Sequence, residues 1–197
     1  MRLTQAERSS FESTRYESME SQGSEALEAR SNTYSLRSPR LADSREIWRL
    51  VCESEQLDRN SPYAYLLLCS DFAATSLVAE ASGRVIAFVC GYRPPDRSDT
   101  VFVWQIGVAR EARRCGTGAA LLDGLLAQPG CRDVMFLEAT VTPSNTASYA
   151  LFSAFARRHQ AALHEDCGFA GSLFPGRDHE DEIRLRIGPL GSQASNA

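Results

Sequence analysis

A basic turn that contains glycine is the segment of this sequence whose residue types say most about chemistry. Residues 108–119, VAREARRCGTGA, run from a strand-like stretch through Arg113 and Arg114 to Gly116 and Gly118, and then into an apolar helical pattern. Free amides at the start of a helix point toward an anion, and the helix dipole favours negative charge there. The arginines add positive charge, and glycine allows the backbone to come close to a ligand. The turn therefore predicts a phosphate-binding site, with an ordinary strand-to-helix turn as the alternative.

A second group of residues has the types needed for proton transfer. The string DHEDEI puts His179 and Glu182 just before a strand-like run, and Glu138 lies inside another such run. An imidazole or a carboxylate can act as a general base toward an amine. A solvated position is the alternative for each of the three. A metal site is not expected, because the string lacks the i, i+4 histidine pair of zinc hydrolases.

Length and composition limit the classes of protein to which these residues can belong. A chain of 197 residues, 43% hydrophobic and 23% charged, has the size of one globular domain. A formal net charge of −4 argues against a nucleic-acid partner, which usually selects a basic surface. No apolar run approaches the roughly 20 residues that span a bilayer, so a membrane partner is not expected. We therefore expect a small-molecule partner.

The cysteines and the two ends of the chain add expectations about location and order. The six cysteines are widely spaced and include no C-x-x-C pair, which is typical of free thiols in the reducing cytoplasm. No apolar signal-peptide region follows the first residues. Residues 1–33 and 191–197 are polar and contain few large apolar side chains. We expect them to be disordered tails that flank a single domain at 34–190.

The first half of this domain reads as one strand, two helices and three strands. Residues 34–37 predict a short strand, and Asp43 with Glu46 three residues later forms a capping-box signature that opens a helix. Ser61 and Pro62 have the types of an N-cap and a first helical residue, so a second helix is expected to run through Phe72. Residues 76–81, 84–92 and 100–109 are rich in β-formers and predict three strands.

The second half alternates between helices and strands. A helix is expected after Gly116 and to end before 129–130, followed by a strand at 134–141, a helix at 144–160 and a final strand at 183–187. Consecutive strands in the first half imply antiparallel pairing, whereas the strand-helix-strand unit from 101 to 141 implies a parallel pair. The sequence therefore predicts an α/β (α+β) domain with a mixed sheet.

The spacing R-x-x-G-x-G, formed by Arg113, Gly116 and Gly118 after a β-rich strand, resembles the acyl-CoA-binding motif of the GNAT acetyltransferase superfamily. The resemblance implies a mostly antiparallel twisted sheet with helices on both faces and a splay between the central strands. It also implies acetyl-CoA as co-substrate. The residues that it assigns to the cofactor are Ile106, Val108, Arg113, Arg114, Cys115, Gly116, Thr117, Gly118, Ala119 and Asn145.

Two positions near the next helix compare differently with that superfamily. Asn145 matches an asparagine that members commonly place against the cofactor, although it is equally suited to cap the helix. Phe152 stands where many members carry a tyrosine that protonates the leaving thiolate. Without that acid, a thiolate with a pKa near 8.5 can leave unprotonated or take a proton from water, and Tyr63 or Tyr149 can replace it.

Longer strings resemble one branch of the superfamily, the diaminobutyrate acetyltransferases of ectoine biosynthesis. They lie at 57–69, 91–95, 102–105, 137–148 and 183–189, and the resemblance runs from about residue 34 to residue 190. It implies transfer of acetyl from acetyl-CoA to the γ-amine of L-2,4-diaminobutyrate. Members of this branch are typically homodimers. The tail at 1–33 lies outside the resemblance.

The strings particular to this branch supply the candidate acceptor site. Asp58, Tyr63, Trp104 and Thr142 are the expected substrate-binding residues. Asp58 also has the type of a turn cap, Tyr63 can simply pack, and a tryptophan in a strand is often part of the core. The candidate catalytic residues are Glu138, His179, Glu182 and Tyr63.

Two further readings of function stay open. The first keeps the cofactor and changes the acceptor to another diamine, an antibiotic amine or a protein N-terminus. The second is a CoA-binding sensor without activity, which the missing acid at Phe152 favours.

Overall fold

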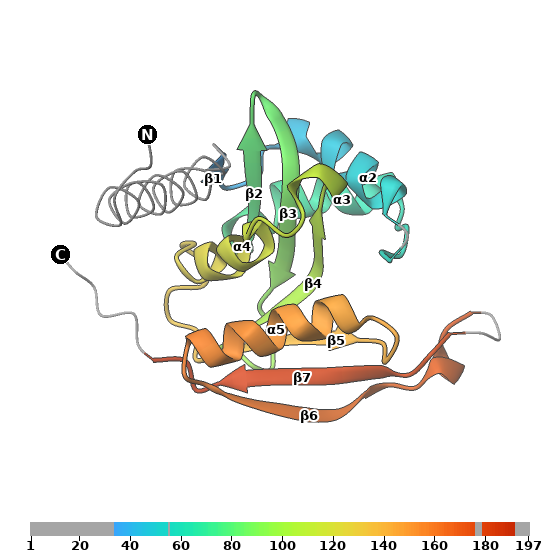
Figure 1. Cartoon of the computed structure of the whole chain (residues 1–197), viewed down its shortest axis with the longest axis vertical. Coiled ribbons are helices and arrows are strands. Elements are labelled where there is room, and N and C mark those ends of the chain that lie inside the picture. The colour runs from blue at the N-terminus through green and yellow to red at the C-terminus, as the bar shows by residue number, and fades with distance from the viewer. Residues whose placement is uncertain (1–33, 55, 176–178, 192–197) are drawn as a thin grey trace, which may run out of the picture. The chain divides into compact units, whose positions relative to one another are not determined.

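The computed structural model describes residues 34–54, 56–175 and 179–191. The tail predicted at 1–33 lies outside the described residues, and so does the tail predicted at 191–197 except for Gly191. The described residues form a seven-stranded sheet with the strand order β1-β2-β3-β4-β5-β7-β6. All neighbouring strands are antiparallel except β4 and β5, which are parallel. The predicted mixed sheet is therefore confirmed, and Figure 1 shows it from the side of α4 and α5.

The element bounds follow the sequence pattern closely. The strands are β1 (Ser35–Arg37), β2 (Ser76–Ala81), β3 (Arg84–Tyr92), β4 (Thr100–Val108), β5 (Phe136–Val141), β6 (Ala162–Phe169) and β7 (Glu182–Gly188). The helices are α2 (Ser44–Glu53), α3 (Pro62–Ser70), α4 (Thr117–Leu126) and α5 (Thr146–Arg158). As predicted, Ser61 caps α3, accepting a hydrogen bond from the Tyr63 amide, and Pro62 is its first residue. No helix in the described ranges is long and apolar enough to cross a membrane.

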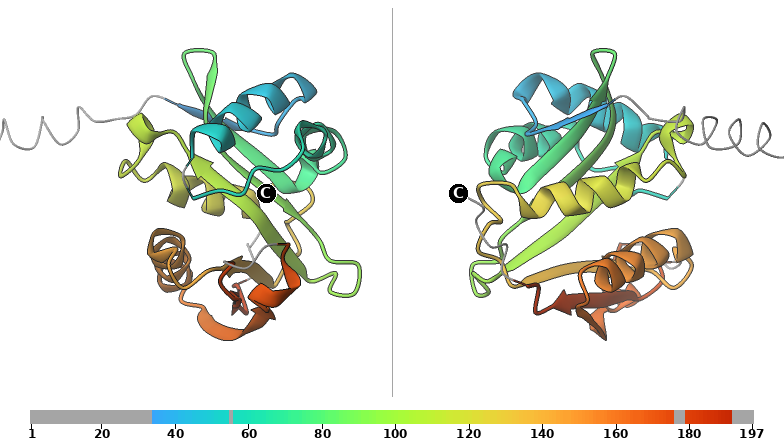
Figure 2. Two further views of the ribbon diagram at one scale, coloured as in Figure 1. Left: turned by 90° about the vertical axis from the view of Figure 1, so that its right-hand side faces the viewer. Right: turned by 60° about the vertical axis from the view of Figure 1, so that its left-hand side comes forward.

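Helices cover the sheet on both faces but not along its whole width. Helices α4 and α5 lie on one face, α4 over β2 and β3 and α5 over β6 and β7, while α2 and α3 lie behind β3 and β4 (Figures 1 and 2). One apolar core forms under α4 and α5 around Leu121, Phe155 and Leu185. A second core forms under α2 and α3 around Ile47 and Phe88. No helix of the described residues covers the face of β5, β7 and β6 opposite α5 (Figure 2).

The two central strands separate along their length. Strands β4 and β5 are paired only from Thr100 and Phe136 to Val103 and Ala139, so the rest of β4 has no partner on that side. The strands diverge toward the side on which the α2–α3 and β6–β7 connections lie (Figures 1 and 2). This is the splay that the resemblance implied.

Two local predictions were wrong. Helix α2 begins next to Asp43 as expected, but no capping box forms there, because the Asp43 carboxylate accepts hydrogen bonds from the Arg40 amide and the Arg37 guanidinium instead. Helix α3 ends at Ser70, before the predicted Phe72. Strand β6 received no predicted bounds of its own, since its sequence ALHEDCGF lacks an apolar alternation. Its pairing with β7 makes it a strand.

Candidate functional site: a glycine turn beside a splayed sheet

The basic turn between β4 and α4 has the backbone geometry of an anion site. A short 3-10 helix at Arg110–Ala112 follows β4, and Arg114 and Gly116 then take positive φ angles of 62° and 76°. Gly116 is the N-cap of α4, and its carbonyl accepts the first helical hydrogen bond, from Ala120. The left-handed conformation explains the glycine at 116, where other side chains would be strained.

This geometry leaves the amides of Thr117, Gly118 and Ala119 as donors at the helix start. Gly116 and Cys115 are exposed, while the Thr117 hydroxyl donates to the Ala112 carbonyl, at 3.1 Å, and fixes the turn. A Cβ atom at Gly118 would meet only ordinary contacts, the nearest 3.5 Å away at Leu151. The fold itself therefore does not require glycine at 118. A ligand that approaches the backbone at this point would require it.

The outer edge of β4 offers a second set of backbone groups. The amide of Ala109 donates to Ile86 on β3, so the hydrogen-bonded positions on β4 alternate from there. By that alternation the amides of Ile106 and Val108 point away from β3 and into the splay. The Arg113 side chain donates to the Val108 carbonyl, at 3.0 Å, which ties the turn to this edge. Predicted cofactor residues on β4 and in the turn thus lie side by side.

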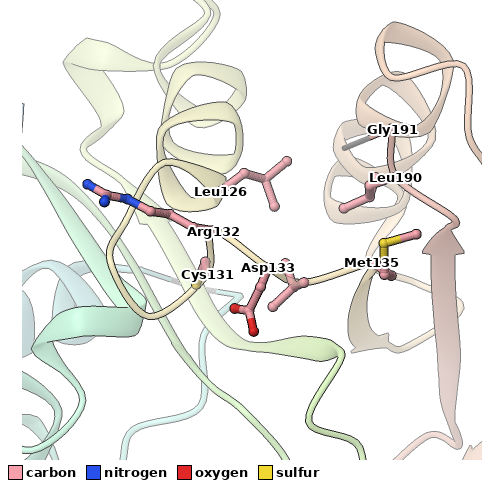
Figure 3. Close-up of a pocket in the computed structure, with 8 residues that line it drawn as sticks. Leu126, Cys131, Arg132, Asp133, Met135, Leu190 and Gly191 are labelled. Atoms are coloured by element: carbon pink, nitrogen blue, oxygen red, sulfur yellow. The ribbon is translucent and has the colours of Figure 1, made fainter. Parts of the chain in front are cut away.

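Of two surface cavities, one lies beside this turn and the other does not. A cavity of about 280 Å³ lies beside it, between the end of α2 and the end of β4, and Val108, Arg110 and Arg113 line it. A pocket of about 90 Å³ is lined by Leu126, Leu190 and the residues that lead into β5 (Figure 3). Leu126 is the last residue of α4, whereas the turn precedes its first. The smaller pocket is therefore not part of the site.

The α2–α3 connection is held against β4 by a residue that the sequence did not single out. Gln105 is buried, donates to the Asp58 carbonyl at 2.9 Å, and accepts from the Tyr65 hydroxyl at 3.0 Å. Burial raises the pKa of Tyr65, so this phenol stays protonated as a donor. Gln105 belongs to a string that carried the resemblance, but its spacing gave no sign of this contact.

The predicted acceptor residues of this region lie on one side of the sheet. Trp104 has no register partner at a β-bulge opposite Cys90 and Gly91, and its ring stacks on Tyr65 at 6.4 Å. It is 36% exposed, so it is not the core residue of the alternative reading. Tyr63 is 64% exposed and Asp58 is also exposed. Both are free to contact a ligand.

Glu138 lies in β5 and is only 2% exposed, so the alternative of a solvated position is wrong for this residue. Its carboxylate accepts from Arg184 at 2.9 Å and from Arg186, and the Arg97 guanidinium is 3.6 Å away. Both carboxylate oxygens are therefore already held by arginines. This arrangement makes Glu138 the least available of the three predicted bases.

The other two candidate bases lie at the β6–β7 connection. The His179 ring stacks on Phe174 at 3.7 Å, and its Nδ1 lies 2.7 Å from the Glu180 carbonyl. Glu182 is the first residue of β7 and is half-buried. Among the described residues, no ion pair or side-chain hydrogen bond engages its carboxylate.

A contact that the sequence did not predict anchors this connection. The Glu180 carboxylate accepts from the hydroxyl and the amide of Ser144, just before α5. Thr142 is half-buried in the same short segment after β5, and its hydroxyl lies 3.4 Å from that of Ser144. The β6–β7 connection is thereby fixed beside the splay. No cluster of three or more metal-ligating side chains occurs in the described part of the chain.

The start of α5 and the site of the missing acid are also defined. Asn145 caps α5 and accepts from the Ser148 amide at 3.1 Å, which is the structural role weighed for it. Phe152 is 2% exposed and belongs to the core. The Tyr149 hydroxyl donates to Glu165 on β6 at 2.6 Å, and this hydrogen bond raises the pKa of Tyr149. Its proton is thus directed toward β6.

Comparison with known proteins agrees with this geometry. Residues 41–156 match the model of the acetyltransferase (GNAT) family. The L-2,4-diaminobutyric acid acetyltransferase of Streptomyces anulatus is 48% identical over 164 residues, which cover 82% of this chain and 93% of the relative. The enzyme of the same name from Shouchella clausii is 42% identical over 168 residues, 85% of this chain and 94% of the relative.

Two solved structures are similar to this chain, one in sequence and fold and the other in fold alone. The diaminobutyrate acetyltransferase of Paenibacillus lautus, solved with its substrate L-2,4-diaminobutyric acid and coenzyme A, is 38% identical with a TM-score of 0.78. The match covers 82% of this chain and 98% of that one. The ribosomal-protein-S18-alanine N-acetyltransferase of Escherichia coli is 19% identical with a TM-score of 0.61, and shares the fold alone.

Proposed function

Because the chain belongs to the GNAT acetyltransferase family, we propose that it transfers the acetyl group of acetyl-CoA to the γ-amine of L-2,4-diaminobutyrate. The observation that carries this proposal is the pairing of two surfaces at the splay. A glycine turn with three free amides and an unpaired β4 edge lies on one side. Trp104, Asp58 and the connection that bears Glu182 lie on the other, an aromatic and acidic surface suited to a cationic amine.

On the cofactor side, the residues fit a molecule with a pyrophosphate and an amide-bearing arm. The amides of Thr117, Gly118 and Ala119 hold the pyrophosphate, and Arg113, Arg114 and the exposed Cys115 and Gly116 border it. Ile106 and Val108 pair through their backbone with the pantetheine arm. Bound there, acetyl-CoA supplies the acetyl group. Asn145 contributes by fixing the start of α5 through its cap.

Two groups of the chain act on the reacting atoms. The Val108 amide points into the splay and donates to the thioester oxygen as negative charge develops there, a contribution of roughly 3 to 4 kcal/mol. Glu182 takes the proton from the attacking amine, because within the described ranges no ion pair or side-chain hydrogen bond engages its half-buried carboxylate. His179 lies three residues earlier and is the alternative base.

On the acceptor side, the amino groups of the substrate need acceptors and an apolar wall. The Asp58 carboxylate binds an ammonium group, Trp104 forms the wall, and Tyr63 and Thr142 supply hydroxyls. The Gln105 side chain donates a hydrogen bond to the backbone carbonyl of Asp58 and so holds Asp58 in place. Phe152 is in the core and Tyr149 is bonded to Glu165, so of the two predicted replacements for the acid Tyr63 is the one that protonates the thiolate.

The proposal extends to the assembly and the pathway. We propose a homodimer, since β6 lies at the edge of the sheet and exposed edge strands favour pairing with another chain. The product would then enter ectoine biosynthesis. Light scattering of the purified protein at several concentrations would measure the mass and test the dimer.

The test of activity is acetylation of four amines by the purified protein. Acetyl-CoA would be incubated with L-2,4-diaminobutyrate, ornithine, lysine or putrescine, and free CoA and the acetylated position would be followed by chromatography and NMR. Turnover confined to diaminobutyrate at its γ-amine is the expected result. Preference for another amine would change the acceptor. If no amine is acetylated although acetyl-CoA raises the melting temperature, the sensor reading replaces this one.

A further inference from the structure

The face of β5 and β7 that lacks a helix carries more positive charge than the chain itself balances. Glu138 and Arg186 are register partners across β5 and β7, and Thr140 and Arg184 form the next pair on the same face. Three guanidinium groups, those of Arg97, Arg184 and Arg186, surround the single Glu138 carboxylate. Among the described residues, Arg97 alone of the three has another carboxylate partner, Asp96. The cluster therefore keeps donors that its one buried acid does not satisfy.

Arg184 differs from the other two arginines in its aromatic neighbours, which lie on β4 and β6. Its guanidinium lies 5.8 Å from the centre of the Phe102 ring on β4 and 5.6 Å from that of Phe169 on β6. Phe102 precedes Trp104 by two residues on β4. Along β7, Arg184 follows Glu182 by two residues and shares its face. Arg184 thus contacts β4 at Phe102 and lies on the same face of β7 as Glu182, the proposed base.

The hydrogen bonds of Arg184 leave one edge of its guanidinium available. Its Nη1 donates to Glu138, and in the described part of the chain the structure records no acceptor for Nε or Nη2. Asp166 on β6 is the register partner of Arg184 but is exposed and forms no ion pair within 4 Å among the described residues. A guanidinium held on one side presents its remaining donors in a fixed fork, which matches the two oxygens of a carboxylate.

We propose that Arg184 binds the α-carboxylate of the amino-acid acceptor and that Glu138 is a positioning residue that orients this guanidinium. The inference rests on the proposed function, because it assigns a specificity contact to that same site. The other acceptor-side residues, Asp58, Tyr63 and Glu182, are acids or a phenol and suit ammonium groups. Arg184 supplies the opposite charge, so an α-amino acid is selected over a simple diamine.

The experiment compares two acceptors that differ only in this group. Steady-state rates would be measured with L-2,4-diaminobutyrate and with 1,3-diaminopropane, the same diamine without its carboxylate, for the wild type and for Arg184→Gln. Wild-type protein is expected to prefer diaminobutyrate. In Arg184→Gln, kcat/KM for diaminobutyrate is expected to fall roughly 10- to 100-fold, as for a lost hydrogen-bonded charge contact, while that for diaminopropane stays within about threefold.

Two further variants separate recognition from folding. Arg186→Gln removes a neighbour that binds the same Glu138 carboxylate, and it is expected to keep the wild-type preference. Glu138→Gln is expected to raise the KM for diaminobutyrate and leave that for acetyl-CoA unchanged. A melting temperature raised by acetyl-CoA in each variant verifies that the cofactor side is intact.

The outcomes distinguish this inference from the function on which it rests. If wild-type protein acetylates neither acceptor, the proposed function fails. If wild-type protein prefers diaminobutyrate and Arg184→Gln retains the same preference, the function stands and the role of Arg184 is refuted. An equal loss with both acceptors would also refute it, because that result indicates a general disturbance of the sheet.

Discussion

The proposed cofactor side and the proposed acceptor side of the splay are built in different ways. The cofactor side consists of one continuous segment, from the outer edge of β4 through Gly116 to the first turn of α4, and most of its donors are backbone amides. The acceptor side draws side chains from four separate places: Asp58 before α3, Trp104 on β4, Glu138 on β5 and the pair Glu182 and Arg184 on β7. One side depends on chain geometry and the other on tertiary assembly.

This difference implies that the two sides respond to different changes. Amides of the main chain survive most substitutions, so the cofactor side is sensitive chiefly to glycine replacement and strain. Each contact on the acceptor side depends on one side chain, and a single substitution removes it. We therefore expect acceptor-side variants to change kcat or the KM for the amine, and cofactor-side variants to change the KM for acetyl-CoA.

The largest expected effect is on the acceptor side, at the proposed base. Glu182→Gln is expected to lower kcat by about 10²- to 10⁴-fold, the usual contribution of a positioned general base, with the KM for acetyl-CoA unchanged. Steady-state kinetics and the pH profile of kcat measure this. The rising limb that reports the base is expected to disappear in the variant.

Glu165→Gln is the matched control, since this carboxylate also lies in the β6–β7 half but binds Tyr149 on the opposite face. It is expected to keep wild-type kcat. If Glu182→Gln retains more than a third of the activity while His179→Ala loses it, the imidazole is the base instead.

The ion pair at the start of α2 lies outside the proposed cofactor and acceptor sides. It tests whether the loss of any ionic contact lowers activity. Asp43 binds Arg37 at 2.6 Å, and that hydrogen bond holds the pKa of Asp43 below its ordinary value. The ion pair therefore contributes stability that is present above the unfolded carboxyl pKa of about 3.9, and that is lost as the pH falls through the lower folded pKa. Asp43→Asn is expected to lose about 3 kcal/mol of unfolding free energy at pH 7.

Urea unfolding at pH 7 and at pH 3 measures this loss, and the difference from wild type is expected to shrink at the lower pH. Both KM values are expected to stay unchanged while the protein is folded. A shift in either KM would mean that the two sides of the splay are coupled to the α2 face, which contradicts the division drawn above.

The next effect is smaller and falls on the cofactor side. Gly118→Ala adds a methyl group that the fold accommodates, and alanine favours a helix by up to about 1 kcal/mol over glycine. We expect equal or higher stability together with a KM for acetyl-CoA raised about tenfold, since a displaced phosphate loses a charged hydrogen bond. Thermal melts and kinetics measure the two quantities on the same sample.

Gly124→Ala is the control in the same helix. Its added Cβ would lie 2.8 Å from a Leu77 methyl carbon and 3.1 Å from one of Leu36. The crowding is expected to cost roughly 1 kcal/mol of stability and leave the KM for acetyl-CoA unchanged. An unchanged KM in Gly118→Ala as well would show that the turn does not approach the cofactor.

The same division explains what the sequence predicted and what it did not. Arg113, Gly116 and Gly118 are contiguous, and their spacing reports local backbone geometry that a sequence can encode directly. The contact of Gln105 with Asp58 joins residues 47 positions apart, and that of Arg184 with Glu138 joins residues 46 apart. No periodicity signals such contacts. They exist only once the strands are in register.

Local pattern also failed where tertiary contacts override it. Asp43 has the type and spacing of a capping box, but its carboxylate is taken by Arg37, which β1 brings beside it. Strand β6 lies at the edge of the sheet and most of its side chains are exposed, so its sequence shows little apolar alternation. In both cases the deciding partner lies on another element, Arg37 on β1 and the pairing strand β7.

The smallest expected effect is the protection of one exposed thiol by acetyl-CoA, with a second exposed thiol as its control. Cys115 lies in the turn and Cys167 on β6, whereas Cys69, Cys90 and Cys131 are buried. Burial raises the pKa of Cys69 to about 11 and that of Cys131 to about 12, so few of these buried thiols are present as the reactive thiolate. Iodoacetamide is expected to label Cys115 and Cys167 first, as measured by peptide mass spectrometry.

Acetyl-CoA at about four times its Kd is expected to slow the alkylation of Cys115 roughly fivefold and to leave the alkylation rate of Cys167 unchanged. Equal protection of both thiols would indicate a change throughout the domain, and protection of neither would remove the turn from the cofactor site.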